Sequence, residues 1–538
     1  MDGSAVSPAL APFALTALAI GAVWWWLGAP IQLPPSPLAA GQKLDCVSYA
    51  PFRDGQDPLV EGTKVQPAQI DQDLALLSKY TDCVRTYSVD DGLDNVLASA
   101  RRYGLKVLHG VWISNKAEKT RQQIATTIKL AKEYPDVIRA VIVGNEVLLR
   151  GDMSAPDLMA KIREVKAQVS VPVSYADVWE YWLRYPEVEN VVDFVTIHIL
   201  PYWEDFPLPA SLAAAHVDAI RKKVAAAIPN KEIVIGEVGW PSAGRMREGA
   251  RPSPSNQARV IGETLALAHR ENFRVNVIEA FDQPWKRWLE GSVGGYWGIF
   301  DRATNKPKFP FSGAVSDHPY WVAQALAGIL LCALTFGGAA AAGGDKTTKQ
   351  PPFLFWPKIA AFAFLSAILF GWTLEMVPID SFSIGGWLRS LAFAAVAASA
   401  PIVCAIACAR NRSLPTFASL LNASERPGVL AWPLGITFIA LALLAIQTAL
   451  GLDFDPRYRA IPFAPLGAAV VPFLVLRFSA PRPCGPRAAA EKAAAMVLVV
   501  SAAYIVLNEG FANWQAVWLC AGLVCLAFIL AWVRDAPN

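Results

Sequence analysis

Charged side chains are scarce in this chain of 538 residues: Asp, Glu, Lys and Arg make up 17%, against a hydrophobic share of 54%. So apolar a composition is unusual for a wholly soluble protein and indicates that part of the chain lies in lipid. The formal net charge is only +3, and no basic stripe with interleaved aromatic residues occurs. These absences exclude the usual electrostatic footprint of a nucleic-acid-binding surface, so we expect no nucleic-acid partner.

The eight cysteines include no CxxC pair, which excludes the common zinc and redox motifs. We therefore expect neither a metal nor any other cofactor. Cys46 and Cys83 fall on predicted neighbouring strands, where an oxidising compartment would permit a bridge. Two buried free thiols are the favoured alternative, because geometry rules out most strand pairs. The other six belong to or border apolar stretches, where free thiols are ordinary small hydrophobic groups: Cys332, Cys404, Cys408, Cys484, Cys520 and Cys525.

Lys and Arg are also absent before the first apolar stretch, residues 10–27. A cleaved signal peptide would need basic residues before its apolar core and a small-residue cleavage site after it. We favour a retained membrane anchor, in which Trp24, Trp25 and Trp26 form an aromatic collar at the interface. With the Pro-rich linker that follows, this anchor is expected to occupy residues 1–37.

Seven further apolar stretches follow residue 320, and each is long enough, at about 20 residues, to cross the hydrocarbon core of a bilayer. We expect them to form a seven-helix transmembrane domain at residues 320–538. They run approximately over 321–343, 354–374, 388–409, 429–450, 461–478, 489–507 and 513–532.

Positive charge gathers in alternate connections between these stretches, which predicts that those connections are cytoplasmic. Arg457 and Arg459 depart from the pattern. The resulting topology places both termini in the cytoplasm and residues 38–319 on the other side, which is the periplasm in a Gram-negative cell. We therefore expect a multi-pass protein of the bacterial inner membrane. The basic connections include Lys346, Lys349, Arg410, Arg412, Arg426, Arg482 and Arg534.

The exported segment lacks a glycine-rich phosphate-binding turn after its first β-type run, where the sequence reads Tyr49-Ala50-Pro51-Phe52-Arg53. This absence argues against a doubly wound open sheet, the competing topology. Eight β-type runs alternate with segments of helical periodicity, a pattern that favours a (β/α)8 TIM barrel at 38–319, followed by the all-α membrane domain. The runs are 44–49, 83–87, 106–112, 137–145, 171–176, 192–199, 232–238 and 275–281.

Polar or aromatic residues stand at the end of every predicted strand. The carboxyl ends of barrel strands meet at one mouth, where the active sites of TIM barrels lie. Aromatic rings stack on sugar rings, and amide, carboxylate and guanidinium groups bind sugar hydroxyls, so this lining is typical of a carbohydrate cleft. Taken alone, any one of these aromatic residues is more often part of a core. The residues are Tyr49, Arg85, Tyr87, Trp112, Asn145, Glu146, Tyr175, Asp177, His198, Tyr202, Glu237, Trp240, Glu279 and Asp282.

Glu146 and Glu237 each end a short run rich in β-branched residues. A single glutamate in this position is more often a solvated strand terminus. Here the two stand at the ends of the fourth and seventh predicted strands, across the mouth from each other. A pair of carboxyls so placed is typical of the acid and the nucleophile of a retaining glycosidase.

Six motifs follow one another in the exported segment: Val84-Arg85-Thr86-Tyr87, Gly144-Asn145-Glu146-Val147, Gly236-Glu237-Val238-Gly239-Trp240-Pro241, Phe281-Asp282-Gln283-Pro284-Trp285-Lys286, Tyr296-Trp297-Gly298-Ile299-Phe300 and Lys306-Pro307-Lys308. In this order they resemble the motifs of glycoside hydrolase family 17, which contains β-1,3-glucanases and β-glucanosyltransferases. The resemblance does not extend to the apolar segments.

The resemblance implies a role for each glutamate. Glu146 would protonate the departing glycosidic oxygen, one of the two carboxyls having a raised pKa, and Glu237 would attack the anomeric carbon. Asn145 would bind the sugar 2-hydroxyl; closing a turn is its alternative role. Tyr202 is similar to the aromatic residue that holds the nucleophile, and Arg85 would stabilise the Glu237 carboxylate by its charge. The substrate-binding residues we expect are Tyr49, Arg85, Tyr87, Asn145, Tyr175, Asp177, Tyr202, Trp203, Trp240, Glu279, Asp282, Trp285 and Lys286.

The chain departs from the plant members of the family at His198-Ile199-Leu200-Pro201-Tyr202-Trp203 and at Gln283, so their substrate preference is not carried over. It is similar to bacterial membrane proteins described as β-1,6-glucan synthases, yet it shows no nucleotide-sugar site. Anchoring favours remodelling of an emerging glucan, so a transglycosylase acting on periplasmic β-1,3-glucan, β-1,6-branched or cyclic, is the leading hypothesis. A membrane-anchored β-1,3-glucan hydrolase and a non-catalytic glucan-binding or export protein are the alternatives. The expected partners are β-glucan, the lipid bilayer and a membrane glucan synthase or exporter.

Overall fold

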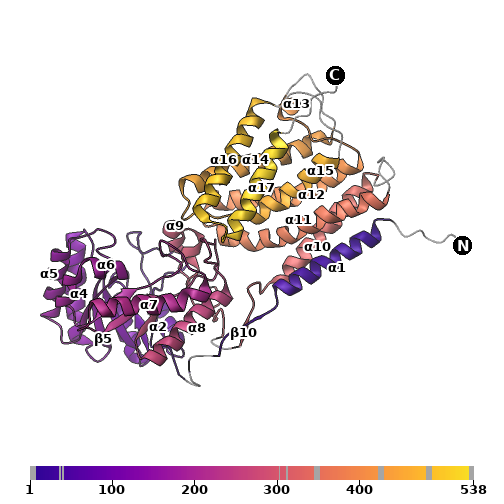
Figure 1. The fold of residues 1–538 in the computed structure, drawn as a ribbon. Coiled ribbons are helices and arrows are strands. Elements are labelled where there is room, and N and C mark those ends of the chain that lie inside the picture. The colour runs from indigo at the N-terminus through magenta and orange to yellow at the C-terminus, as the bar shows by residue number, and fades with distance from the viewer. Residues whose placement is uncertain are drawn as a thin grey trace. The chain divides into compact units, whose positions relative to one another are not determined.

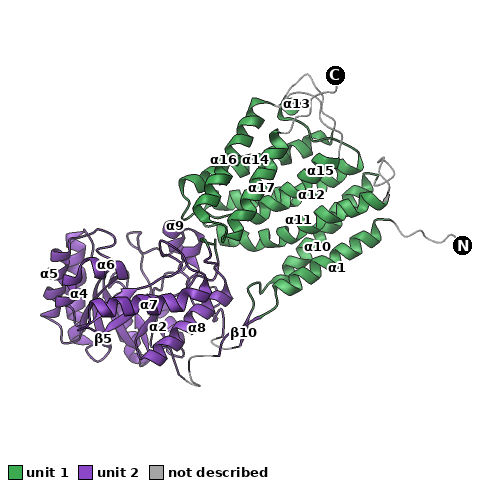
Figure 2. Ribbon diagram, in the orientation of Figure 1, with its two compact units in different colours: residues 1–30, 244–248, 316–538 green, residues 31–243, 249–315 purple. Residues whose placement is uncertain are grey.

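The computed structural model describes residues 8–35, 38, 42–301, 303–310, 313–343, 352–421, 429–479 and 488–531. The chain divides into two compact units (Figure 2). The barrel unit comprises Ile31–Ala243 and Gly249–Val315, and the helical unit comprises Met1–Pro30, Gly244–Glu248 and Ser316–Asn538. Linker residues 36 and 37, Cys484 and five of the basic loop residues named above lie outside the described residues: Lys346, Lys349, Arg426, Arg482 and Arg534.

Eight parallel strands close into a barrel in the order of the sequence, from β2 to β9. Figure 1 labels β5 and several helices of this unit, among them α4, α5 and α7. This confirms the predicted TIM-type fold. The closed order also explains why no strand needs to be long, because each is paired on both sides. The strands are β2 Cys46–Ser48, β3 Cys83–Arg85, β4 Lys106–Val111, β5 Ile138–Asn145, β6 Val173–Val178, β7 Val195–His198, β8 Ile233–Val238 and β9 Val275–Val277.

Helices alternate with these strands. Two of them show how the local sequence sets a helix start. Ser154 precedes α5 and Ser253 precedes α8, and each serine accepts a hydrogen bond from the backbone N–H group three residues later. Each of these helices also has proline in its first turn. The helices of this unit are α2 Pro67–Leu77, α3 Val96–Arg102, α4 Ala117–Glu133, α5 Ala155–Lys166, α6 Trp179–Arg184, α7 Ala210–Ala227, α8 Pro254–Glu271 and α9 Arg287–Glu290, with 3-10 turns at Leu93–Asn95, Pro186–Val191, Pro284–Lys286 and Ser292–Gly295.

Alternate residues along each strand face the inside of the barrel. At its lower level they form one apolar cluster: Cys46, Cys83, Leu108, Ala140, Ile142, Ala176, Phe194 and Val234. The residues between them, such as Val47, Val84 and Val141, belong to a larger cluster that includes helix residues. A short antiparallel pair, β1 Ile31–Gln32 with β10 Ala314–Val315, brings the two ends of the barrel unit together.

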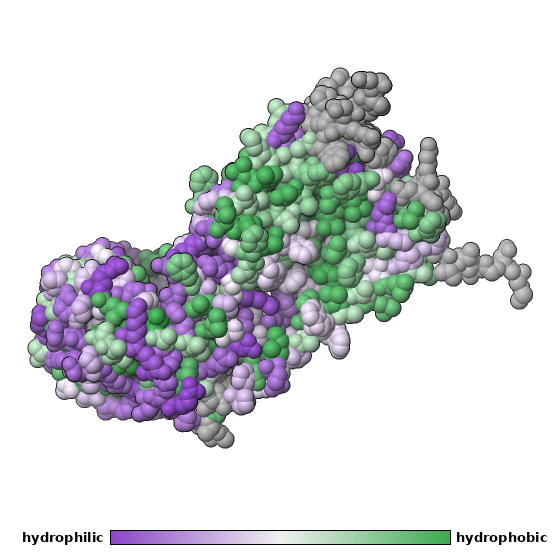
Figure 3. All heavy atoms as spheres, in the orientation of Figure 1, coloured by the Kyte–Doolittle hydropathy of each residue, from purple (hydrophilic) through white to green (hydrophobic). Residues whose placement is uncertain are grey.

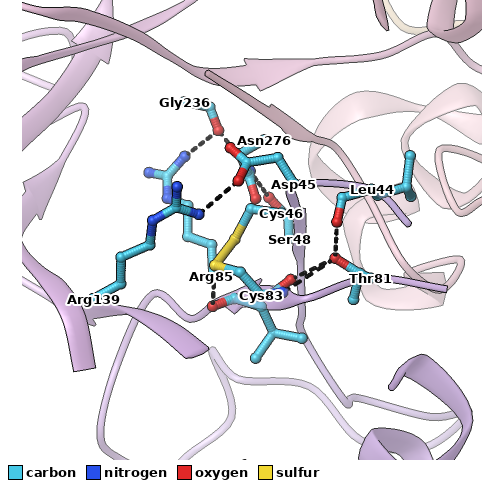
Figure 4. Close-up of a disulfide and its surroundings, with 11 residues drawn as sticks. Leu44, Asp45, Cys46, Ser48, Thr81, Cys83, Arg85, Arg139, Gly236 and Asn276 are labelled. Atoms are coloured by element: carbon cyan, nitrogen blue, oxygen red, sulfur yellow. Dashed lines mark hydrogen bonds and ion pairs between the residues drawn. A yellow bond between two sulfur atoms is a disulfide. The ribbon is translucent and has the colours of Figure 1, made fainter. Parts of the chain in front are cut away.

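Cys46 and Cys83 form a disulfide bridge (Figure 4). The interpretation as two free thiols is therefore wrong. Strands β2 and β3 pair with Val47 opposite Val84, so the preceding cysteines also stand side by side, with their Cα atoms 4.4 Å apart. Adjacent strands can be bridged when both side chains point to the same face, as these do.

Among its described residues, the helical unit has seven helices that are long and apolar enough to cross a membrane. Hydrophobic residues cover much of its surface in Figure 3. Its exposed apolar side chains include Leu326, Leu330 and Val500. The predicted stretch 461–478 forms α15, which has only 17 residues and packs against α11, α12 and α17. The length criterion is thus met by the anchor and by six of the seven later stretches. The helices are α1 Leu10–Leu27, α10 Trp321–Ala341, α11 Pro352–Asp380, α12 Ile384–Ala409, α13 Phe417–Leu421, α14 Ala431–Phe454, α15 Phe463–Ser479, α16 Ala489–Glu509 and α17 Trp514–Ala531.

Candidate active site

Glu146 directly follows strand β5, which ends in an irregular turn. The pairing of β5 with β6 shifts register between Ile142 and Asn145, and bulges beside active sites re-aim the side chains that follow them. Gly144 has a φ of 91° and Glu146 a φ of 55°, a left-handed conformation that residues other than glycine rarely adopt. A Cβ atom at position 144 would lie 2.8 Å from Cγ2 of Val147. The turn therefore needs glycine, and it leaves 24% of the Glu146 side chain exposed.

Glu237 lies near the end of β8, beside a second irregularity. The pairing of β7 with β8 skips one residue, from Ile197 opposite Ile235 to His198 opposite Glu237. The skip turns Glu237 toward the inside of the barrel, where only 5% of the residue is exposed. The Tyr87 hydroxyl donates a 2.8 Å hydrogen bond to its Oε1. A buried carboxylate held by a fixed donor has one orientation, which suits a nucleophile.

One carboxylate oxygen of Glu146 and one of Glu237 lie within 4.8 Å of each other. Inverting glycosidases separate their carboxyls by about 6.5–9.5 Å to admit a water molecule, whereas retaining enzymes hold them about 5–5.5 Å apart. The separation in this barrel falls on the retaining side of that division. The two side chains are thus placed for attack by one and protonation by the other.

Arg85 is buried inside the barrel beside both glutamate turns. Its Nη1 donates to the carbonyl oxygen of Gly236 at 2.7 Å and to Glu237 at 3.3 Å, and its Nη2 donates to Oδ1 of Asn145 at 2.6 Å. Glycine at position 236 makes this space, because a Cβ there would lie 3.3 Å from Nη1 and 2.4 Å from Cγ2 of Thr196. The guanidinium therefore supplies a permanent positive charge at the nucleophile.

His198, the last residue of β7, lies between the two glutamates. Its Nδ1 is 2.8 Å from Oε1 of Glu146, and its Nε2 is 3.1 Å from Nη1 of Arg85 and 3.5 Å from Oε1 of Glu237. In the described part of the chain, the group of His and carboxylate side chains close enough to hold a metal ion consists of Glu146, His198 and Glu237. We expect no metal there, because the nearby charge of Arg85 would repel a cation.

The pKa of Glu146 reflects opposing influences. Burial raises it, but the hydrogen bond of His198 and the charges of Arg150 and Arg85 lower it, and the net shift is downward. The raised pKa expected for the acid is therefore not found at Glu146. Burial, together with the neighbouring Glu237 carboxylate, raises the pKa of Tyr87 well above its usual value, so this hydroxyl remains a donor.

Tyr175 and Asp177, both on strand β6, lie near Glu146. The Tyr175 hydroxyl donates to Asp177 and accepts from the backbone N–H of Leu148 at 3.0 Å. Burial raises the pKa of Asp177 to about 6, and the charge of Glu146 adds to that rise. Both residues are completely buried, so they support the turn after Glu146 from below.

Two half-buried lysines pair with buried carboxylates that follow β9. Lys286 donates to Glu279 at 3.0 Å, and Lys308 donates to Asp282 at 2.6 Å. Burial raises the pKa of Glu279 to about 7 and that of Asp282 to about 6, with the lysine charges opposing the rise. The charge of Lys286 is attracted to Glu237 as well as to Glu279, which places this pair near the nucleophile.

Several of the predicted substrate-binding aromatic residues are buried or half-buried. Tyr49 is buried and donates to Asp73 at 3.0 Å. Trp240 is buried and donates to the carbonyl oxygen of Arg251 at 3.0 Å, and its ring meets that of the buried Tyr202 edge-on. Trp203 and Trp285 are half-buried.

Two further residues complete the network beneath Glu237. Asn276 on β9 donates to the carbonyl oxygen of Gly236 at 2.6 Å and to Ser48 at 2.7 Å, and Ser48 lies 2.7 Å from the Tyr87 hydroxyl. Neither was predicted as a site residue, and His198 was noted only as a strand end. The alternation of side chains along a strand could have indicated Ser48 and His198, because every second residue faces the same side. Ser48 stands two residues after Cys46, and His198 two residues after Thr196.

The comparisons with known proteins concern the barrel. Residues 46–298 match the family described as "BtgE/BtgC glycoside hydrolase domain". A protein named "Glucan 1,3-beta-glucosidase" from Arthroderma benhamiae is 27% identical over 269 residues, which are 46% of this chain and 86% of the relative. One of the same name from Saccharomyces cerevisiae is 25% identical, over 46% of this chain and 85% of the relative. A crystal structure described as a family 17 β-1,3-glucanosyltransferase from Rhizomucor miehei is 25% identical, covers 50% of this chain and 97% of that chain, and has a TM-score of 0.43.

Proposed function

We propose that the barrel, a glycoside hydrolase domain of the family 17 type, is a retaining transglycosylase that acts on β-1,3-glucan. The observation that carries this proposal is that one carboxylate oxygen of Glu146 lies within 4.8 Å of one of Glu237. The names of the relatives from Arthroderma benhamiae and Saccharomyces cerevisiae support a β-1,3-linked glucan as substrate.

The reaction then proceeds in two balanced steps. Glu237 attacks the anomeric carbon and forms an ester bond to it, while the glycosidic bond breaks and its oxygen takes a proton from Glu146. In the second step Glu146 removes a proton from an acceptor hydroxyl, the acceptor oxygen bonds to the anomeric carbon, and Glu237 leaves as a carboxylate. A sugar hydroxyl as acceptor gives transfer, and water gives hydrolysis.

Three neighbours act on Glu237 and on the sugar. Tyr87 and Arg85 hold one oxygen of Glu237 at 2.8 and 3.3 Å, which leaves the other oxygen for the attack. Asn145 accepts from Arg85 through Oδ1, so its amide NH2 is the group that can donate to the sugar 2-hydroxyl. Such a hydrogen bond strengthens in the oxocarbenium-like transition state.

Aromatic side chains around the mouth support transfer to a sugar over hydrolysis. Trp203 and Trp285 are half-buried and Trp288 is 65% exposed, which suits the stacking of an acceptor chain. Trp182 is buried and donates to the carbonyl oxygen of Thr196, so it does not contribute to such a surface. β-1,6 branching or cyclisation would depend on the acceptor hydroxyl that this surface presents.

The location of the protein belongs to the same proposal. We place the catalytic domain at residues 38–319, between an anchor at 1–37 and the helical domain at 320–538, on the outer side of a bacterial inner membrane. Seven helices of spanning length and the Cys46–Cys83 bridge support this placement, because disulfides persist in oxidising compartments. The helical domain would then bring the barrel to a glucan synthase or exporter in the same membrane.

Product analysis of the full-length protein in detergent tests the proposal. With laminaripentaose as the probe, we expect products both longer and shorter than five sugars; shorter products alone would support a hydrolase, and binding without any product would support a non-catalytic protein. Glu237→Gln should abolish turnover, and a 2-deoxy-2-fluoro-β-laminaribiosyl donor should label Glu237 in the wild type. Glu118→Gln, on the exposed face of α4, is the matched control. Full activity in Glu237→Gln would refute the assignment.

A further inference from the structure

His198 is the residue of the mouth that connects the two glutamates. It is 1% exposed, and both of its ring nitrogens lie within hydrogen-bonding distance of a named partner, Glu146 on one side and Arg85 on the other. Four charged or titratable groups from four strands face it: Arg85 of β3, Glu146 after β5, Asp177 of β6 and Glu237 of β8.

The contact with Arg85 determines which nitrogen of His198 carries the proton. A guanidinium can only donate hydrogen bonds, so Nε2, 3.1 Å from Nη1, is the acceptor. The proton of the imidazole then sits on Nδ1 and is donated to Oε1 of Glu146 over 2.8 Å. Arg85 therefore donates to both Nε2 and Glu237, and His198 passes the polarisation on to Glu146.

We propose that His198 is a positioning residue that gives the two oxygens of Glu146 separate tasks. Oε1 accepts from Nδ1–H whether Glu146 is protonated or not, and Oε2 carries the proton that is exchanged with the glucan. This inference rests on the proposed function, and it extends it by naming the oxygen that acts and the residue that selects it.

The two steps then need no rearrangement of His198. In the first, the proton on Oε2 moves to the departing oxygen while Nδ1–H remains bonded to Oε1. In the second, Oε2 takes the proton of the acceptor hydroxyl, again with Oε1 occupied. When Glu237 becomes an ester, it loses its negative charge and competes less for Arg85. Arg85 then polarises His198 more strongly, which stabilises the Glu146 carboxylate at the stage where it must act as the base.

A variant that removes the donor should therefore change the pH profile. In His198→Phe, Glu146 loses its hydrogen bond but remains partly shielded from solvent, so we expect the basic limb of kcat/KM for laminaripentaose to move up by about one pH unit. We also expect kcat to fall by about 10- to 100-fold, because the acid is no longer held in place. His198→Asn keeps an N–H donor and should lie closer to the wild type in both respects.

Two controls make the outcome decisive. His269→Asn makes the same substitution at an exposed histidine of α8 and should leave the profile unchanged. Nitrogen-15 NMR of the full-length protein with labelled histidines reads the tautomer directly, whether or not the Phe variant folds. An unshifted basic limb in His198→Phe, equal behaviour of the Asn and Phe variants, or a proton on Nε2 would each overturn the inference. An inactive wild type would instead overturn the proposed function.

Discussion

The disulfide between Cys46 and Cys83 gives the prediction that can be worked furthest from the structure. The bridge closes a loop with a sequence separation of 37. Closing a loop of this length removes about 13 cal/mol/K of entropy from the unfolded chain, which is about 4 kcal/mol at 25 °C. For a domain of this size, that loss corresponds to a fall in the midpoint of thermal unfolding of about 10 °C. We therefore expect Cys46→Ala with Cys83→Ala to lower the stability of the barrel by this amount.

Two measurements check this prediction. Titration of thiols in the denatured, unreduced protein should find two fewer thiols than after reduction, since Cys46 and Cys83 are bridged. The temperature at which half of the laminaripentaose activity is lost reports on the barrel, and it should fall in the double variant and in the reduced wild type alike. Cys525→Ala, which removes a free thiol of the helical unit, should leave it unchanged. Eight titratable thiols in the unreduced protein, or a decrease of less than about 2 °C in the inactivation temperature of the double variant, would refute the reasoning.

Two further substitutions test the packing and the electrostatics around the site. Burial raises the pKa of Glu279 to about 7 in the folded protein, so its contribution to stability is complete below about pH 4.5 and is lost as the pH rises through 7. The stability lost over this range is roughly 3 kcal/mol. In Glu279→Gln, the inactivation temperature should therefore fall less as the pH rises from about 4.5 to 7. Gly236→Ala would place a Cβ 2.4 Å from Cγ2 of Thr196, so we expect a loss of about 1–3 kcal/mol in urea unfolding. Thr196→Ser, which removes that methyl group, should restore part of this loss.

The barrel and its two glutamates could be predicted from the sequence because each strand carries its own signal. The runs that become β5 and β8 are rich in β-branched residues and end at Glu146 and Glu237, and parallel strands in sequence order bring their carboxyl ends to one mouth. Tyr87 was predicted at this mouth for the same reason, Arg85 was expected beside the nucleophile from the family resemblance, and the structure brings both to Glu237.

Side-chain partners across the barrel could not be predicted in this way. The bridge depends on the register of β2 against β3, which pairs Val47 with Val84, and a shift of one residue would turn one cysteine outward. The position of His198 depends on the skipped residue in the pairing of β7 with β8. Both are properties of strand pairing, so no pattern within one segment reveals them. Tyr49 and Trp240 ended their strands like the other predicted residues, yet packing buried them.

The interior of the barrel is built in levels, and this order places the candidate site at its upper end. The lowest level is apolar and bridged, and it includes Cys46 and Cys83. Two residues further along the same strands stand Ser48 and Arg85, which begin the hydrogen-bonded network. A guanidinium buried at 1% exposure is tolerated there because four acceptors surround it, among them His198. The bridge links β2 and β3 two residues before Ser48 and Arg85, so it fixes the two strands that carry these members of the network.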